Sequence, residues 1–276
     1  MHHSALRTGN QRHCDVTELR TAQLYMNLLT ERGIKVTLFA SGRCFTEEWR
    51  ELRPIANHPL VELGGHNFSC LTPAIVHRIS GALVGSYNGP AWLQRVDVEL
   101  TKAAYRWRMG QEMRLWRNHM YKHGPYTDRV LSDAGVHLCS DGVKRSCVGP
   151  TLAPGGLLNW PLNIIPDHEH IYHAERTPEW VENWQRRYHW CDDFGAQSYP
   201  IADWTDLVLS QLRANEARGV VSNMIIHPIT MYLSDRFASF GRIADYLATR
   251  HTEHLGAAAR SATVVPKVSP TVKASA

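Results

Sequence analysis

The stretch "IKVTLFASG", residues 34–42, decides the fold that the sequence predicts. Its β-branched and apolar residues, closed by a glycine, are typical of a buried strand. The preceding residues 18–33 place apolar side chains at helical spacing and end on Gly33, which favours an amphipathic helix. Residues 12–16, "RHCDV", indicate a short strand before that helix. A strand, a helix and a strand within about 30 residues form a βαβ unit and predict a parallel sheet.

The alternation of strands and helices continues along the chain. Further strands are expected at 60–67, 113–118, 136–141, 157–167 and 220–228. Further helices are expected at 47–56, 97–110, 126–135, 177–190 and 203–219. Repeated βα units leave two architectures, a doubly wound sheet or a β/α barrel. In both, chemistry gathers at the carboxyl ends of the strands.

Composition narrows the class of protein. The chain has 276 residues, 43% of them apolar and 20% charged, with a formal net charge of +4. Lys and Arg are not concentrated anywhere, so we expect no nucleic-acid partner, and no apolar run reaches the length of a membrane span. Six cysteines form no CxxC pair and no signal peptide is evident, which favours a cytoplasmic protein with reduced thiols. We expect one domain over residues 12–255 between disordered ends, residues 1–11 and 256–276.

Side chains with acid, base or ligand chemistry end the predicted strands. They are Asp15, His66, Arg117 to His119, Asp141, Asp167 and His227. A hydrolytic zinc site needs three protein ligands and a water, a carboxylate that accepts a proton and a histidine that donates one. This chain has a candidate residue for each of these roles, and it also has an arginine to orient the carboxylate. The candidates are Asp15, His66, Cys70, His227 and Arg117.

The order of these segments resembles the polysaccharide deacetylase (NodB-homology, carbohydrate esterase family 4) family. A strand ending in Asp leads through a helix to "KVTLFASG". Then follow "GGHNFSC", "WRNHMYKHGPYTDRVLSDAGVHLCSD" and "IIHP". The resemblance covers roughly residues 12–250. It implies a distorted (β/α) barrel of parallel strands with outer helices.

The resemblance also implies an activity and roles for residues. The activity is metal-dependent removal of an acyl group from an amino sugar or a related small amide, with Zn²⁺ or another divalent metal as cofactor. His66 matches the first metal histidine, Arg117 the arginine that steadies the catalytic aspartate, and His227 the general acid. Three further residues are expected to contact substrate, namely His119, Tyr121 and Asp167.

Two departures from the family pattern leave alternatives open. Cys70 stands where the second metal histidine belongs; it is either a thiolate ligand or a small buried hydrophobe. The first motif, "DVTE", has one aspartate where the family has two acids. Asp15 is then either the proton acceptor, with Thr17 replacing the metal carboxylate, or the ligand, with Cys14 replacing the base; Glu18 could substitute. These departures also keep a second function class open, a catalytically impaired barrel that binds a glycan or a protein partner.

Overall fold

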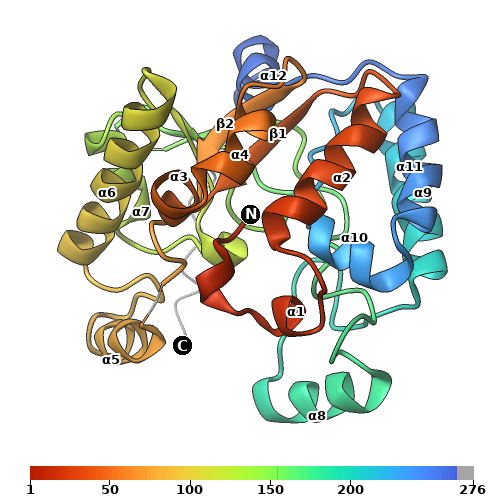
Figure 1. Cartoon of the computed structure of the whole chain (residues 1–276), viewed down its shortest axis with the longest axis horizontal. Helices are drawn as coiled ribbons and strands as arrows, with labels where there is room; N and C mark the ends of the chain where they lie inside the picture. Colours follow the sequence, from red (N-terminus) through yellow and green to blue (C-terminus); the bar gives the residue numbers. More distant parts are fainter. Residues whose placement is uncertain (72, 154, 266–276) are drawn as a thin grey trace, which may run out of the picture.

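The computed structural model describes residues 1–71, 73–153 and 155–265. Its centre is one sheet of six strands in the order β1-β2-β3-β4-β6-β5, surrounded by helices (Figure 1). The strands are β1 Val36–Ala40, β2 Val61–Gly65, β3 Leu115–Trp116, β4 Leu138–Cys139, β5 Thr151–Leu152 and β6 Leu158–Asn159. Every neighbouring pair is parallel except β5 with β6. The predicted parallel sheet with outer helices is therefore confirmed.

Helices separate the strands from β1 to β4, and within the described residues the helices after β6 follow one another with no named strand between them. The first part of the chain carries the short helices η1 Ser4–Leu6 and α1 Gly9–Arg12, then α2 Glu18–Thr30, α3 Gly42–Glu47 and α4 Trp49–Ala56. The middle carries α5 Ala74–Val84, α6 Ala91–Met109, η2 His119–Tyr121, α7 Thr127–Asp133 and α8 Pro178–Tyr188. The last part carries α9 Ile201–Ala217, α10 Pro228–Asp235, α11 Ala238–Ala248 and α12 Leu255–Ser261.

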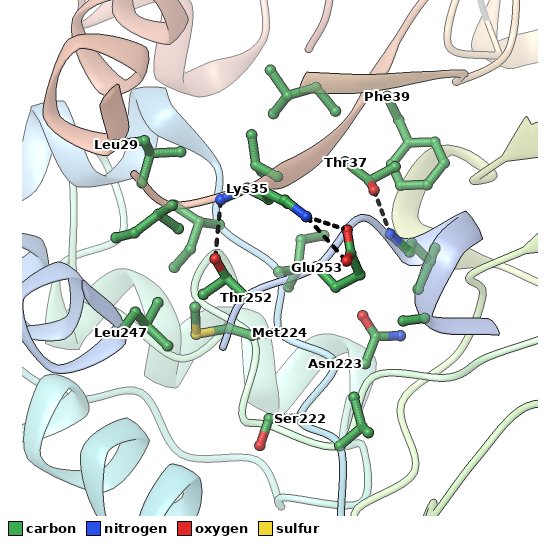
Figure 2. A pocket seen from close by; sticks show the side chains of 18 of the residues that line it. Leu29, Lys35, Thr37, Phe39, Ser222, Asn223, Met224, Leu247, Thr252 and Glu253 are labelled. Atoms are coloured by element: carbon green, nitrogen blue, oxygen red, sulfur yellow. Dashed lines mark hydrogen bonds and ion pairs between the residues drawn. The ribbon is translucent and has the colours of Figure 1, made fainter. Parts of the chain in front are cut away.

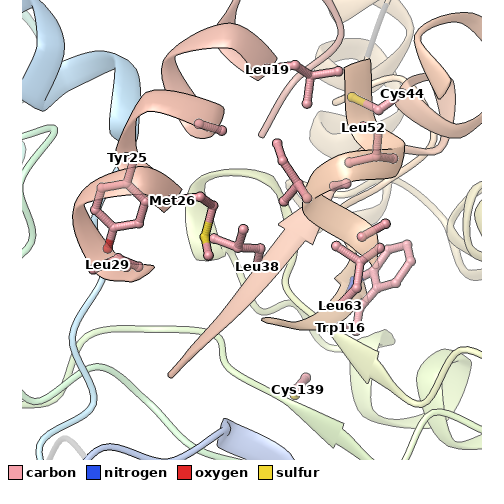
Figure 3. Close-up of a cluster of buried hydrophobic side chains, with 14 of the residues drawn as sticks. Leu19, Tyr25, Met26, Leu29, Leu38, Cys44, Leu52, Leu63, Trp116 and Cys139 are labelled. Carbon is pink, nitrogen blue, oxygen red and sulfur yellow. The ribbon is translucent and has the colours of Figure 1, made fainter. Parts of the chain in front are cut away.

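Helix α2 shows how sequence and packing agree. The Thr17 hydroxyl accepts the N–H of Arg20 at 3.1 Å and caps the helix. The apolar positions Leu19 and Leu29 are at most 1% exposed, and they pack with residues of β1 and β2 in the main core (Figure 3). Burying a leucine side chain in this way stabilises the fold by about 1.5–3 kcal/mol.

The double glycine of β2 lets three strands approach closely. A Cβ on Gly65 would lie 2.4 Å from the sulfur of Met113 and 2.8 Å from the Trp116 ring. A Cβ on Gly64 would lie 2.8 Å from the Phe39 ring. Directly after this pair, the N–H of His66 bonds to the Ala40 carbonyl at 3.0 Å. The next residue of the site, Arg117, bonds through its N–H to the Gly65 carbonyl at 3.0 Å, so both side chains leave the sheet at the same level.

The start of the chain corrects two expectations. Residues 12–16 form no strand, because α1 ends at Arg12 and the chain then turns. Their polar composition is satisfied locally: the Gln11 side chain donates to the Val16 carbonyl at 2.9 Å and accepts the Glu18 N–H at 2.9 Å. Residues 1–11 are also ordered into helical turns rather than disordered. His3 among them is 2% exposed, and its Nδ1 lies 3.1 Å from Ser41 Oγ.

Later segments differ from expectation in three places. The connection at 72–95 contains helix α5. Residues 220–227 have no regular secondary structure, although they do lead to His227. The expected disordered tail begins instead with α12, which is held where the Gly256 N–H donates to Glu62 at 2.9 Å; residues 266–276 of that tail lie outside the described residues.

Within the described part of the chain, no helix has the length and apolar character needed to cross a membrane.

Candidate metal centre and acid pair

Three histidines from distant parts of the chain meet above the carboxyl ends of the strands. His2 comes from the N-terminus, His66 follows β2, and His119 begins η2. The Nε2 atom of His2 lies 3.3 Å from Nε2 of His66 and 3.2 Å from Nδ1 of His119. The far side of two rings is fixed: His66 Nδ1 lies 2.8 Å from the Arg117 carbonyl, and His2 Nδ1 lies 3.0 Å from the Glu18 carboxylate.

The hydrogen-bond partners determine which ring nitrogens carry hydrogen. A carbonyl or carboxylate oxygen only accepts, so Nδ1 of His66 and of His2 must each donate. In the neutral rings both Nε2 atoms are then acceptors that face each other at 3.3 Å. Two acceptors at this distance need a cation or a proton between them. Because burial lowers the pKa of His66 and His119, those rings are neutral, which is the form that binds a metal.

Cys70 completes this group. Ligand-type atoms of His2, His66, Cys70 and His119 all lie within 4.8 Å of one another. Cys70 is 4% exposed and adopts a left-handed backbone with φ of 52°, which costs a non-glycine residue free energy. Burial raises the pKa of its thiol well above the ordinary value, so the thiolate needs a neighbouring cation. Three imidazoles and one thiol fit a divalent metal such as zinc.

A second candidate pair is His227 with Asp167. Nδ1 of His227 lies 2.7 Å from one Asp167 oxygen, and its backbone N–H donates to the other at 2.5 Å. Asp167 is fully buried. Burial alone would lower the pKa of His227, but the Asp167 carboxylate outweighs it and the pKa is raised. His227 lines the same cavity as His2, His66 and Arg117.

Arg117 and Tyr121 serve as supports in the structure. The Arg117 guanidinium, 7% exposed, donates to the Ser140 carbonyl at 2.8 Å and to its hydroxyl at 2.6 Å, and lies 4.8 Å from the centre of the Phe39 ring. The Tyr121 hydroxyl donates to Glu169. Arg117 therefore holds the loop after β4 and does not contact Asp15.

The structure does not bring Asp15 to the histidines. Its side chain is 67% exposed, pairs with Arg236 at 3.5 Å and accepts from Tyr232 at 3.2 Å. The expectation that Asp15 ends a strand at the site was wrong, because that strand does not form. The carboxylate beside the metal group is instead Glu18, 3% exposed. Burial raises its pKa, but His2 and the chain's amino group outweigh this and bring it to about 2.

Of the four residues in this group, the sequence motif predicted His66 and Cys70 as metal ligands. It predicted His119 as a substrate contact and gave no role to His2. His2 belongs to a polar segment that was expected to be disordered, so only its residue type could have suggested a role.

His123 joins two acids beside the site. Its Nδ1 lies 3.1 Å from Asp141 and its Nε2 lies 2.9 Å from Asp128. Burial lowers the pKa of His123, but these carboxylates outweigh it and raise it to about 9. Asp141 also accepts the backbone N–H and the side-chain amide of Asn118 at 2.8 and 2.7 Å. This cluster fixes the residue that precedes His119.

No family model and no curated protein matches the chain. Solved structures do match it. A putative polysaccharide deacetylase from Mycobacterium smegmatis has a TM-score of 0.63 at 18% identity, over 94% of this chain and 82% of its own. A probable polysaccharide deacetylase from Pseudomonas aeruginosa PAO1 has a TM-score of 0.61 at 12% identity, over 91% and 74%. PuuE allantoinase has 0.60 at 14% identity, over 87% and 71%. The chain therefore has the distorted (β/α) barrel fold of these structures, and the resemblance predicted from its motifs is confirmed at the level of the fold.

Proposed function

We propose that this chain is a metal-dependent hydrolase that removes an acyl group, most simply acetyl, from an amino sugar or a related small amide. The observation that carries the proposal is the pair of facing Nε2 atoms of His2 and His66, 3.3 Å apart, with His119 and Cys70 around them. Three imidazoles and a thiol gathered in one group, with a carboxylate-supported histidine that lines the same cavity as His2 and His66, suit amide hydrolysis.

The ligand set favours zinc. Imidazole and thiolate are the ligands that zinc takes in proteins, and a thiolate selects against harder ions such as Mg²⁺. Three of these four side chains would suffice to hold the ion, which would leave a position for a water. Zinc bound in this way would lower the pKa of that water and polarise a carbonyl. Glu18 fixes the donor nitrogen of His2, and the Arg117 carbonyl fixes that of His66, as supporting groups around metal sites do.

Proton transfer falls to His227. The Asp167 carboxylate holds the proton on Nδ1 and raises the pKa of the ring, so His227 carries a second proton at Nε2 for the departing nitrogen. Amine leaving groups need this proton because an amide anion is too basic to leave. Tyr121 remains a predicted substrate contact.

The proposed class of substrate follows from the similar structures and from the state of the cysteines. Two structures that share this fold are named polysaccharide deacetylases and one is named an allantoinase. Within the described residues no disulfide joins any of the six cysteines, which fits a reducing compartment and a substrate made in the cytoplasm.

The test measures metal and activity together. We expect the purified protein to carry about one zinc, removable by chelator, and to release acetate from an N-acetylated amino sugar. His66→Ala should lose the metal, whereas His251→Ala, which removes an exposed histidine, should keep it. A folded wild-type protein that binds no divalent metal at micromolar concentration would contradict the proposal.

One observation favours the second candidate, a barrel that binds a glycan or a partner without hydrolysing it. Asp15 lies outside the site, and Glu18, with a pKa of about 2, is a weak proton acceptor. Under this alternative the protein binds metal or sugar, yet releases no acetate from any acylated sugar offered.

A further inference from the structure

The free edge of β1 borders a cavity that is shaped for a β-strand. The cavity has a volume of about 630 Å³ and lies between β1 and residues 220–227. Protein interiors are packed with few voids larger than a water molecule. Figure 2 shows Thr37 and Phe39 of β1 on one side of this space and Asn223 and Met224 on the other. The remaining wall is mostly apolar and includes Tyr25, Leu29 and Ile226.

Along this edge of β1, the backbone N–H groups at the two ends have hydrogen-bond partners, and in the described part of the chain those between them do not. The Val36 N–H bonds to Leu60 on the β2 side, so the N–H groups of 35, 37, 39 and 41 point to the cavity side. At the two ends these are taken: the Lys35 N–H donates to Thr252 Oγ1 at 3.1 Å and the Ser41 N–H donates to the Met1 carbonyl at 3.1 Å. Within the described residues, the N–H groups of Thr37 and Phe39 have no such partner.

Met1 already has the pairing of a parallel strand. Its nitrogen donates to the Phe39 carbonyl at 2.7 Å, while its carbonyl accepts the Ser41 N–H. These two bonds define a parallel bridge opposite Ala40. A chain attached to the Met1 nitrogen and continuing in this direction would run along β1 towards Lys35, through the cavity.

The bonding of the Met1 nitrogen also suits a peptide link. A peptide N–H has one hydrogen, which the Phe39 carbonyl takes. A terminal ammonium has three hydrogens and a full charge, and its other partner here is Glu18 at 3.9 Å.

We propose that this cavity is a docking site for an extended strand of about four residues joined through the nitrogen of Met1 and parallel to β1. Its backbone would pair with Thr37 and Phe39, and its side chains would be apolar or β-branched, because both walls are mostly apolar. The occupant would give β1 a second neighbour and fix the position of the adjoining His2. This inference is independent of the proposed hydrolysis.

The experiment compares chains with two four-residue extensions before Met1, Val-Thr-Val-Ile and Gly-Ser-Gly-Ser. Hydrogen exchange should slow by at least about tenfold at the amides of Thr37 and Phe39 with the first extension only. The amides of Val36 and Leu38 face β2 and serve as the internal control. The melting temperature should also rise with the first extension relative to the second.

Two outcomes would overturn the proposal. Equal exchange at Thr37 and Phe39 in both chains would show that the cavity does not pair with an attached strand. Equal protection by a free Val-Thr-Val-Ile peptide, added to the chain as it stands, would show that the site serves a separate polypeptide.

Discussion

At the scale of single residues, one buried carboxylate governs the protonation of His227. Asp167→Asn keeps the side-chain shape but removes the charge that raises the pKa of His227. The protonated ring is the active form of a general acid, so wild-type activity should persist to higher pH than that of the variant. We expect the alkaline limb of the kcat/KM profile to move to lower pH in Asp167→Asn. An unmoved limb would exclude this pair from proton transfer.

Removing the imidazole itself should affect turnover more than binding. His227→Ala should lower kcat by about 10²–10⁴-fold with little change in KM, because a general acid acts in the transition state. Steady-state kinetics at saturating metal provides the measurement. A large rise in KM with kcat unchanged would instead mark His227 as a substrate contact.

Cys70 tests the metal centre at a position where packing and ligation predict different results. Cys70→Ser keeps the size and removes the soft ligand, so the zinc dissociation constant should rise by at least about tenfold. Cys147→Ser, another buried thiol, is the matched control and should leave zinc binding unchanged. If Cys70 only fills space, both variants will bind zinc equally and differ in melting temperature alone.

Residue-level prediction depended on whether a residue belonged to a recognisable local motif. His66 and Cys70 share a loop after a strand, so their spacing indicated their proximity. The position of His2 depends on contacts with residues 18, 66 and 119, and no local pattern encodes such contacts. The strand predicted before Asp15 was wrong, because its polar neighbours do not form one.

At the scale of elements, helix α2 links fold and site, because its first residue is Glu18. Thr17 caps this helix and also donates its hydroxyl to Glu51 at 2.7 Å. Thr17→Ala should lower the free energy of unfolding by about 1 kcal/mol, measured by urea denaturation. Thr17→Ser retains both hydrogen bonds and should lose much less; an equal loss in both variants would point to the methyl group rather than the cap.

Element prediction worked best where a segment's periodicity was long. The amphipathic pattern of 18–33 gave α2 closely, and the apolar run at 34–42 gave β1. Strands β3 to β6 have two residues each, so their regular part is too short for alternation to define its ends. The segment 220–227 has the composition of a strand, but its pairing with Asn163 is not a strand ladder. The Asn163 N–H donates to the Asn223 carbonyl at 3.1 Å, whereas the Asn223 N–H donates to the Asn163 side chain at 2.8 Å.

At the scale of the whole molecule, stability should depend on pH through His123. Its pKa is about 9 in the folded chain and near 6.5 when unfolded. The stabilisation by Asp128 and Asp141 is therefore complete below pH about 6.5 and is lost as the pH rises through about 9, on the order of 2–3 kcal/mol. Urea unfolding from pH 6 to 9.5 provides the check, and His123→Gln should flatten this part of the profile. An unchanged slope in that variant would assign the dependence to other groups.

The double glycine of β2 has a consequence for how this protein tolerates mutation. Gly64 and Gly65 bear no reactive group, yet a methyl group at either would press on Phe39, Met113 or Trp116. The strands that would be pushed apart carry His66 and Arg117 at their ends. In a scan of all single substitutions, changes at Gly64 and Gly65 should therefore impair function as strongly as changes at the ligands themselves. These glycines set the spacing between the strands that carry the ligands.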